Sequence, residues 1–264
     1  MTLMVNKTLE NRVAVVTGAS SGIGDPAAKE IARRGAVVAL AARDGEKLVG
    51  IAREIRRAGG IALPVQTDVT DDESVRNFIS RTVSELGGVD VLVNNAGLGL
   101  SGRVGELRAD DLRYVYEVNV LGPLRCIQAA LPHMRVGGRI INVSSVVGLR
   151  AIPKGGGYCS SKFALNALSE ALRVEIAERG ITVTSVYPGT TRTAFRDNSR
   201  RTKDEKRGWR PKGVPPEKVA TKIARAAERG GRDLHVSLQD LAFTTASALS
   251  PSLVDRALRS WTKD

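Results

Sequence analysis

The chain has 264 residues, of which 40 are Lys or Arg and 28 are Asp or Glu, giving a formal net charge of +12. Apolar residues make up 42% of the sequence and charged residues 26%, which excludes a disordered or fibrous protein and permits a sizeable core. With only Cys126 and Cys159 present, neither a disulfide framework nor a zinc or other metal site is expected. The charge excess would suit nucleic acid, an anionic lipid or an acidic ligand.

The sequence lacks the patterns of secretory and membrane-spanning segments. Residues 1–10 contain no apolar block, and the uncharged stretch 241–254 is too short to span a bilayer. We therefore expect a cytoplasmic protein in a reducing compartment. Peripheral association with a membrane stays open.

Short β-branched runs alternate with longer segments of helical periodicity over the first two-thirds of the chain. Helices are predicted over residues 26–35, 45–58 and 73–86, where apolar residues recur at i, i+3 and i+4. The alternation predicts one α/β domain over residues 1–264, with a Rossmann-like, doubly wound parallel β-sheet flanked by helices on both faces. The predicted strands cover residues 13–17, 37–40, 61–65, 89–93, 139–143 and 181–186.

The alternation loosens in the last third of the chain. Residues 190–213 are predicted to form a long loop or lid, 215–229 a helix and 233–237 a short last strand. A helical tail over 238–264 is expected to break near Pro251. Glycines are interpreted as marking helix ends, where positive φ is commonly needed; these are Gly35, Gly59, Gly60, Gly87, Gly88, Gly137, Gly138 and Gly180.

A glycine-rich turn follows the first predicted strand and opens the first predicted helix. Glycine lets the backbone turn tightly and approach a pyrophosphate, which then accepts hydrogen bonds at the positive end of the helix. Such turns also serve helix–strand packing, but the position between strand and helix favours a dinucleotide site. The residues expected to bind the cofactor here are Gly18, Ser20, Ser21, Gly22, Ile23 and Gly24.

The end of the second predicted strand bears on the choice between NAD(H) and NADP(H). NAD sites usually place an acid here for the ribose 2′-hydroxyl, whereas this sequence has Ala42 followed by Arg43. An Arg suits a 2′-phosphate by charge and by its planar donor fork, which favours NADP(H). The alternative is a solvated Arg at a helix start, with Asp44 as the N-cap.

Three residues further along form a candidate catalytic group. Tyr158 and Lys162 are four residues apart on a segment with helical spacing, so they lie on one face. A phenol titrates near pH 10, and a nearby ammonium favours the phenolate and lowers that pKa. Ser145 follows a predicted strand at the sheet edge where ligands bind in such folds, and it can donate to a carbonyl oxygen. A half-buried Tyr and a surface Lys would explain the pair in isolation; the surrounding motifs favour catalysis.

The order and spacing of these motifs resemble the short-chain dehydrogenase/reductase family from about residue 10 to 237. The resemblance is carried by Thr17-Gly18-x3-Gly22-x-Gly24, Asp68-Val69, Asn94-Asn95-Ala96-Gly97, Asn119, Ser145, Tyr158-x3-Lys162 and Pro188-Gly189. It implies that further cofactor contacts come from Asp68, Val69, Asn95, Ala96, Gly97, Tyr158, Lys162, Pro188, Gly189, Thr191 and Thr193.

The resemblance also implies four catalytic residues and a reaction that needs no metal. NADPH would give a hydride to a ketone or aldehyde carbon, Tyr158 would protonate the oxygen, and Ser145 would polarise the carbonyl. Lys162 would bind the nicotinamide ribose and lower the Tyr158 pKa, and Asn119 would connect Lys162 to solvent through water. We expect an alcohol and a lipophilic carbonyl compound, 3-oxoacyl or steroid-like, as the substrate pair. The alternative is a catalytically silent NADP-binding scaffold or regulator.

Two features near the motifs need a structural answer. Asp25 follows the glycine turn, where an acid would weaken pyrophosphate binding, so we predict that its side chain points outward. The triplet Gly155, Gly156 and Gly157 before Tyr158 predicts a mobile or roomy edge of the substrate pocket.

Residues 192–212 hold nine cations and three acids, half of the charge excess. The segment is a solvated loop, a site that attracts an acidic substrate or acyl carrier, or a contact with anionic lipid. Nucleic acid is disfavoured, because Phe195 and Trp209 are its only aromatic residues.

The tail carries one apolar face, which favours packing over the substrate pocket or on a neighbouring subunit; contact with a membrane is the alternative. The face is made of Leu253, Val254, Ala257, Leu258 and Trp261. The family resemblance implies a homodimer or homotetramer.

Overall fold

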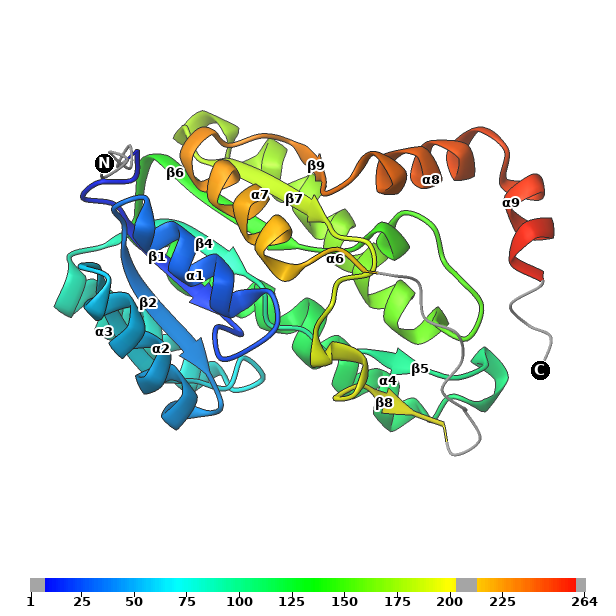
Figure 1. The fold of residues 1–264 in the computed structure, drawn as a ribbon, viewed down its shortest axis with the longest axis horizontal. Helices are drawn as coiled ribbons and strands as arrows, with labels where there is room; N and C mark the ends of the chain where they lie inside the picture. The colour runs from blue at the N-terminus through cyan, green and yellow to red at the C-terminus, as the bar shows by residue number, and fades with distance from the viewer. Residues whose placement is uncertain (1–7, 203–212, 260–264) are drawn as a thin grey trace.

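The computed structural model describes residues 8–202 and 213–259, and its centre is a seven-stranded sheet (Figure 1). The strand order is β3-β2-β1-β4-β6-β7-β9, and every neighbouring pair is parallel. This topology confirms the predicted doubly wound α/β fold. The strands are β1 (Val13–Thr17), β2 (Val37–Ala42), β3 (Ile61–Gln66), β4 (Val89–Asn94), β6 (Met134–Val143), β7 (Thr182–Tyr187) and β9 (Asp233–His235).

Helices cover both faces of this sheet, because each parallel neighbour needs a crossover connection. One core cluster joins α1 (Gly24–Arg33), α2 (Gly45–Arg57) and α7 (Pro216–Arg229) to Ala14 and Val16 of β1. The other joins α3 (Asp72–Leu86), α5 (Gly122–Ala130) and α6 (Gly156–Glu175) to Val15. Successive β1 side chains therefore enter opposite layers, and the whole strand is buried.

Smaller elements frame the carboxyl edge of the sheet. Helix α4 (Ala109–Tyr116) continues through a π-helical turn, Glu117–Leu121, directly into α5. Strands β5 (Leu100–Ser101) and β8 (Arg200–Arg201) form a separate two-stranded parallel sheet. Short 3₁₀ turns lie at Val104–Glu106, Leu131–His133, Val146–Gly148, Ala177–Arg179 and Ala194–Arg196.

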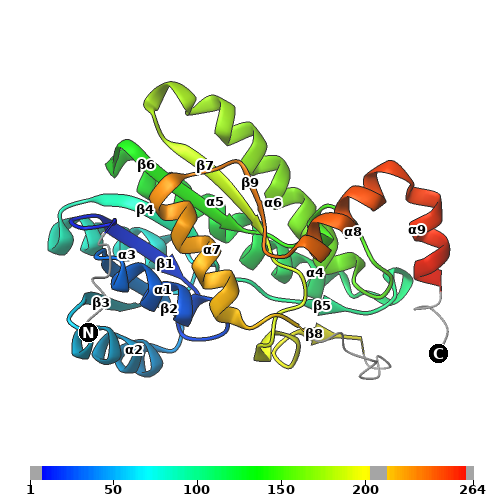
Figure 2. The same ribbon diagram turned by 45° about the horizontal axis from the view of Figure 1, so that its top comes forward.

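The C-terminal elements α8 (Leu238–Leu249) and α9 (Pro251–Leu258) extend away from the sheet in both views (Figures 1 and 2). The break between them falls at Ser250, directly before Pro251, as predicted, since Pro cannot continue an upstream helix. Of the predicted apolar face, Leu258 is buried whereas Leu253 is exposed. Trp261 and the basic residues 203–212 lie outside the described part of the chain. Within that part, no helix has the length and apolar character needed to cross a membrane.

The interpretation of Gly137 and Gly138 as helix-end glycines is wrong. Both lie inside β6, which begins five residues before the predicted strand. Gly137 adopts φ +83°, and the pairing of β4 with β6 shifts register between Val89 and Val91. The two glycines therefore allow an irregular strand rather than ending a helix. Helix α1 also begins two residues earlier than predicted, at Gly24.

Candidate active site

The glycine turn after β1 is packed too tightly for any side chain at two positions. Gly18 has φ +64°, and a Cβ there would lie 2.8 Å from the Ala96 Cα. A Cβ on Gly24 would collide with the Gly18 carbonyl oxygen. Asn95 secures the same turn, because its Nδ2 donates to the carbonyls of Thr17 and Gly18 at 3.0 and 3.2 Å. Two of the predicted cofactor segments, the glycine turn and residues 95–96, are thus in direct contact.

The first turn of α1 is available to an anion. Its N-cap residue, Ile23, provides no side-chain cap, whereas α2 and α3 are capped by the carboxylates of Asp44 and Asp71. Uncapped N–H groups at the positive helix end are the feature that binds phosphate. Gly22 has φ +64°, and the nearest atom to a Cβ there would be the Thr193 methyl at 3.8 Å. A side chain at position 22 would therefore make ordinary van der Waals contact with Thr193, and in the same turn Ser21 is exposed and Ser20 half-buried.

The structure places Arg43 directly after β2, with an exposed side chain. Its Nη1 donates to the Tyr114 hydroxyl of α4 at 3.2 Å. The neighbouring Asp44 is occupied locally, since it caps α2 and forms an ion pair with Lys47 at 2.7 Å. Asp44 is therefore engaged within α2, and Arg43 keeps its positive charge at the end of β2.

The residues after β3 and β4 are held by local hydrogen bonds. The Asp68 carboxylate accepts from the backbone N–H and the hydroxyl of Thr70 at 2.9 and 2.8 Å. Val69 is buried against α5, where a Cβ on Gly122 would lie 2.9 Å from it. The N–H groups of Asn95 and Ala96 both donate to the Thr17 hydroxyl, at 3.0 and 3.1 Å.

The three predicted catalytic side chains meet beyond the ends of β6 and β7. Tyr158 and Lys162 lie on one face of α6, and the Lys162 Nζ is 5.8 Å from the centre of the Tyr158 ring. Ser145 follows β6, donates to the Pro188 carbonyl at 3.2 Å and is hydrogen-bonded to Tyr158. Lys162 is buried and donates to the Val143 carbonyl at 2.8 Å.

Burial acts in opposite directions on the acid and the base of this group. It raises the pKa of the Tyr158 phenol, and the hydrogen bond to Ser145 offsets part of that rise. It lowers the pKa of Lys162 to about 8. At neutral pH the phenol therefore holds its proton and most of the Lys162 population is charged.

Asn119 lies in the π-helical turn, which aims its side chain at the segment after β4. Its Oδ1 accepts from the Leu98 N–H at 2.7 Å, and its Nδ2 donates to the Leu98 carbonyl at 2.8 Å and to Ser161 at 2.9 Å. A Cβ on Gly97 would lie 3.5 Å from the Asn119 Oδ1 and 3.7 Å from the Lys162 Nζ. The structure thus gathers Asn119 and Lys162 around Gly97, which fits the predicted association of these residues.

The segment after β7 closes this edge. Thr191 donates to the Gly189 carbonyl at 3.2 Å, and a Cβ on Gly189 would collide with the Asp240 carboxylate of α8. The Phe195 ring lies 5.5 Å from the Tyr158 ring, centre to centre. Sequence analysis assigned no role to Phe195 or Asp240, because no motif marks them and both reach the site through tertiary packing.

The structure shows the surroundings of both Asp25 and Gly157. Asp25 forms an ion pair with Lys29, one helical turn further along α1, at 2.7 Å, and Lys29 also pairs with Glu54 of α2 at 2.6 Å. Gly157 does not provide room: a Cβ there would lie 2.6 Å from Leu100, so this glycine allows α6 to approach β5 closely. The predicted roomy edge is wrong at Gly157, where close packing is the reason for the glycine.

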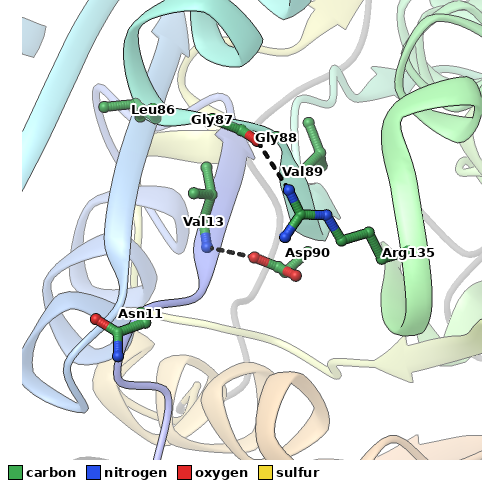
Figure 3. A pocket seen from close by; sticks show the side chains of 8 residues that line it. All are labelled: Asn11, Val13, Leu86, Gly87, Gly88, Val89, Asp90 and Arg135. Atoms are coloured by element: carbon green, nitrogen blue, oxygen red, sulfur yellow. Dashed lines mark hydrogen bonds between the residues drawn. The ribbon is translucent and has the colours of Figure 1, made fainter.

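A separate pocket of about 240 Å³ lies at the opposite edge of the sheet (Figure 3). Its polar groups bind one another: Asp90 accepts from the Val13 N–H at 2.9 Å, and Arg135 donates to the Gly87 carbonyl at 3.3 Å. Val13 and Val89 begin their strands, whereas the candidate catalytic residues follow strand ends. This pocket is therefore distinct from the candidate active site, and it is lined by Asn11, Val13, Leu86, Gly87, Gly88, Val89, Asp90 and Arg135.

The parallel sheet and the uncapped glycine turn define a doubly wound α/β protein whose sheet edge suits a phosphate group, and Ser145, Tyr158 and Lys162 lie at that edge. The family model of the short chain dehydrogenases matches residues 12–204. The chain belongs to the short-chain dehydrogenase family.

Relatives and solved structures agree with this assignment. The uncharacterized oxidoreductase YxnA of Bacillus subtilis is 34% identical over 96% of this chain and 72% of its own length. A short chain dehydrogenase from Burkholderia cenocepacia, solved in complex with NADP, has a TM-score of 0.77 at 32% identity, covering 86% of this chain and 97% of its own. A family member from Burkholderia phymatum, solved with NAD, has a TM-score of 0.82 at 26% identity, covering 93% and 96%.

Proposed function

We propose that the protein is an NADP(H)-dependent oxidoreductase that interconverts a ketone or aldehyde and an alcohol. The observation that carries this proposal is the convergence of Ser145, Tyr158 and Lys162, with Lys162 near Gly97 in the segment that packs on the glycine turn. A proton donor, a polarising hydroxyl and a buried cation at one sheet edge are the groups that carbonyl reduction needs. Asn119 completes the set from the π-helical turn.

Each side chain has a distinct task in this proposal. Tyr158, which holds its proton at neutral pH, donates it to the carbonyl oxygen, while Ser145 donates a hydrogen bond to the same oxygen. The Lys162 ammonium stabilises the resulting phenolate and binds the nicotinamide ribose, and Asn119 holds the 97–98 backbone beside it. The cofactor, when bound, supplies the hydride for reduction and accepts it in oxidation.

The cofactor would lie along the edge formed by the ends of β1, β2, β4 and β7. The pyrophosphate fits the uncapped start of α1, and Gly22 leaves the turn without a side chain where it faces Thr193. The remaining predicted contacts line the same edge; they are Gly18, Ser20, Ser21, Ile23, Gly24, Asp68, Val69, Asn95, Ala96, Gly97, Pro188, Gly189 and Thr191. Arg43, and Ala42 at the position where NAD sites usually carry an acid, support NADP(H) rather than NAD(H).

A lipophilic carbonyl compound, 3-oxoacyl or steroid-like, fits this site best. Phe195 packs on Tyr158 and Val146 lies directly after Ser145, so apolar surface adjoins the proton donor. We interpret residues 190–213 as the substrate lid of a one-domain protein spanning residues 1–264. The basic stretch 192–212 would draw in an acidic substrate or an acyl carrier.

The activity is tested by following NADPH oxidation with a panel of ketones and aldehydes that includes 3-oxoacyl thioesters and steroids. Wild-type turnover is expected on at least one lipophilic substrate. Tyr158→Phe removes the proton donor and is expected to lower kcat by about 10³-fold while NADPH still binds. Undiminished turnover in this variant would refute the mechanism. NADPH binding without turnover on any substrate would favour the scaffold alternative.

We also propose a cytoplasmic homo-oligomer in which a second copy covers α8. Its outward face carries Leu238, Leu241 and Leu249, whereas the polar Thr244 and Ser247 face inward. Helices that lie on anionic bilayers carry Lys and Arg beside their apolar face, and α8 has neither. The chemistry of α8 therefore favours protein over lipid as the covering surface.

A further inference from the structure

Tyr114 contacts both Arg43, the residue proposed to bind the 2′-phosphate, and the segment after β7. Its hydroxyl accepts a hydrogen bond from the Arg43 Nη1 at 3.2 Å, although the two residues are 71 positions apart. Its ring packs under the Arg200 guanidinium, whose central carbon is 4.2 Å from the ring centre. Tyr114 of α4 therefore contacts both Arg43, which directly follows β2, and Arg200 of β8.

The ring of Tyr114 is fixed from its far side. Arg200 cannot leave the ring freely, because it also donates to the Asp111 carboxylate at 2.5 Å, and Asp111 lies one turn earlier on α4. Stacking between a cation and an aromatic ring adds to this hold. The β5–β8 pairing anchors the Arg200 backbone as well. Tyr114 is thus a half-buried, restrained group beside an exposed Arg43.

Because the Tyr114 hydroxyl accepts the hydrogen bond from Arg43, its own hydrogen can be donated to an anion. A Tyr hydroxyl has one hydrogen to donate and lone pairs that accept. Here the lone pair is used by Arg43, and among the described residues the hydroxyl hydrogen has no acceptor. A phosphate that approached Arg43 would find a second donor on Tyr114, and hydrogen bonds to charged groups are the stronger ones.

We propose that Tyr114 is a specificity-determining residue for NADP(H): it holds the Arg43 guanidinium in place and donates its hydroxyl to the adenosine 2′-phosphate. This inference rests on the proposed function and deepens its cofactor preference. The second donor compensates for the exposure of Arg43, since a solvated Arg alone gives modest discrimination. The Arg200–Asp111 pair acts through Tyr114 as a positioning pair.

The experiment compares NADPH and NADH binding by calorimetry in the full chain with Tyr114→Phe, which keeps the ring under Arg200 and removes only the hydroxyl. The dissociation constant for NADPH is expected to rise about tenfold, and that for NADH to stay within about twofold. Tyr116→Phe, which removes a hydroxyl from the same helix two residues on, is the matched control and should leave both constants unchanged.

The outcomes separate this inference from the proposed function. Wild-type protein that binds NADPH no tighter than NADH would refute the NADP(H) preference itself. A wild-type preference that is lost in Arg43→Ala and kept in Tyr114→Phe would overturn the role of Tyr114 alone. An equal loss for both cofactors in Tyr114→Phe would also overturn it, because a merely structural role predicts that result. A loss confined to NADPH supports it.

Discussion

Lys162 is a buried side chain, and burial disfavours its charged form. The side chain is 3% exposed, and burial lowers its pKa to about 8 from an ordinary 10.5. A cation so placed is favoured only if it serves another group, and the neighbouring group is Tyr158, 5.8 Å away. The same burial raises the pKa of Tyr158, the opposite of the lowering expected from the Lys162 ammonium, so at neutral pH the phenol keeps its proton.

The Lys162 pKa predicts a dependence of stability on pH. Between about pH 8 and 10.5 the unfolded chain binds this proton and the folded protein does not, so stability from this group rises with pH through that range. The gain from pH 7 to 10 is about 2 kcal/mol. Urea unfolding of wild-type protein and Lys162→Met at both pH values measures it. The variant should lack the gain, and an equal pH response in the two proteins would contradict the assigned cause.

Two glycines offer a matched pair of Ala substitutions. Gly18→Ala places a Cβ 2.8 Å from Ala96 in a residue with φ +64°, and should destabilise the protein by at least about 1 kcal/mol. Gly50→Ala lies in α2 with nothing within 4 Å of the new Cβ, and should stabilise it by about 0.5–1 kcal/mol. Denaturant midpoints measure both. Equal shifts would show that the turn tolerates a side chain.

At the scale of elements, the long strands and helices of the sheet were predictable and the elements at its edge were not. β1 matches its predicted bounds because five β-branched or small apolar residues fill a strand that is buried throughout. β5 and β8 have two residues each and exist only because they pair with one another. A tertiary contact between segments 100 residues apart has no local sequence signal.

The candidate site divides along the same line. Ser145, Tyr158 and Lys162 were predictable because helix spacing and strand ends place them together. Tyr114 and Phe195 were not, since each reaches the site from an element whose position the sequence pattern does not fix. The prediction of a roomy pocket edge at Gly157 was wrong for a related reason. In a sequence, a glycine that permits close packing cannot be distinguished from one that permits motion.

The docking of β8 on β5 is testable at Gly99. A Cβ there would collide with the Ser199 hydroxyl, so Gly99→Val should displace the strand that carries Arg200 and Arg201. Trypsin cleavage after these residues is expected to accelerate about tenfold or more, because a released strand fits the protease. Gly105→Val, with nothing within 4 Å of its new Cβ, is the control. Identical cleavage rates in both variants would show that the pairing does not restrain the segment.

At the scale of the molecule, some arginines of the described residues join separate elements through ion pairs. Arg34 pairs with Glu30 of its own helix and Glu228 of α7, which ties α1 to α7 under the sheet. Arg125 bridges Asp72 and Glu117. The acids in these pairs are already counted in the net charge, so the excess of +12 remains, and half of it lies in residues 192–212.

The arm formed by α8 and α9 is where the whole molecule departs most from a closed shape (Figure 2). Its first helix seats Asp240 against Gly189, beside the nicotinamide end of the proposed site. The capping box between Ser237 and Asp240 fixes that turn. The outward leucines of α8 then remain to be covered, and exposed apolar clusters of this kind mark interaction surfaces.

A double substitution on α8 tests whether a second copy covers it. Leu241→Glu with Leu249→Glu places two charges on the apolar face, which would be buried in a subunit contact and harmless on a free surface. Wild-type protein is expected to elute as a dimer or tetramer in size-exclusion chromatography with light scattering, and the double variant at a lower mass. Val136→Glu is the control, because Val136 is as exposed as Leu249, at 81%, but lies away from the arm. A monomeric wild-type protein, or a double variant of unchanged mass, would contradict the subunit contact, and wild-type protein that is monomeric and sediments with anionic vesicles would assign the face to lipid instead.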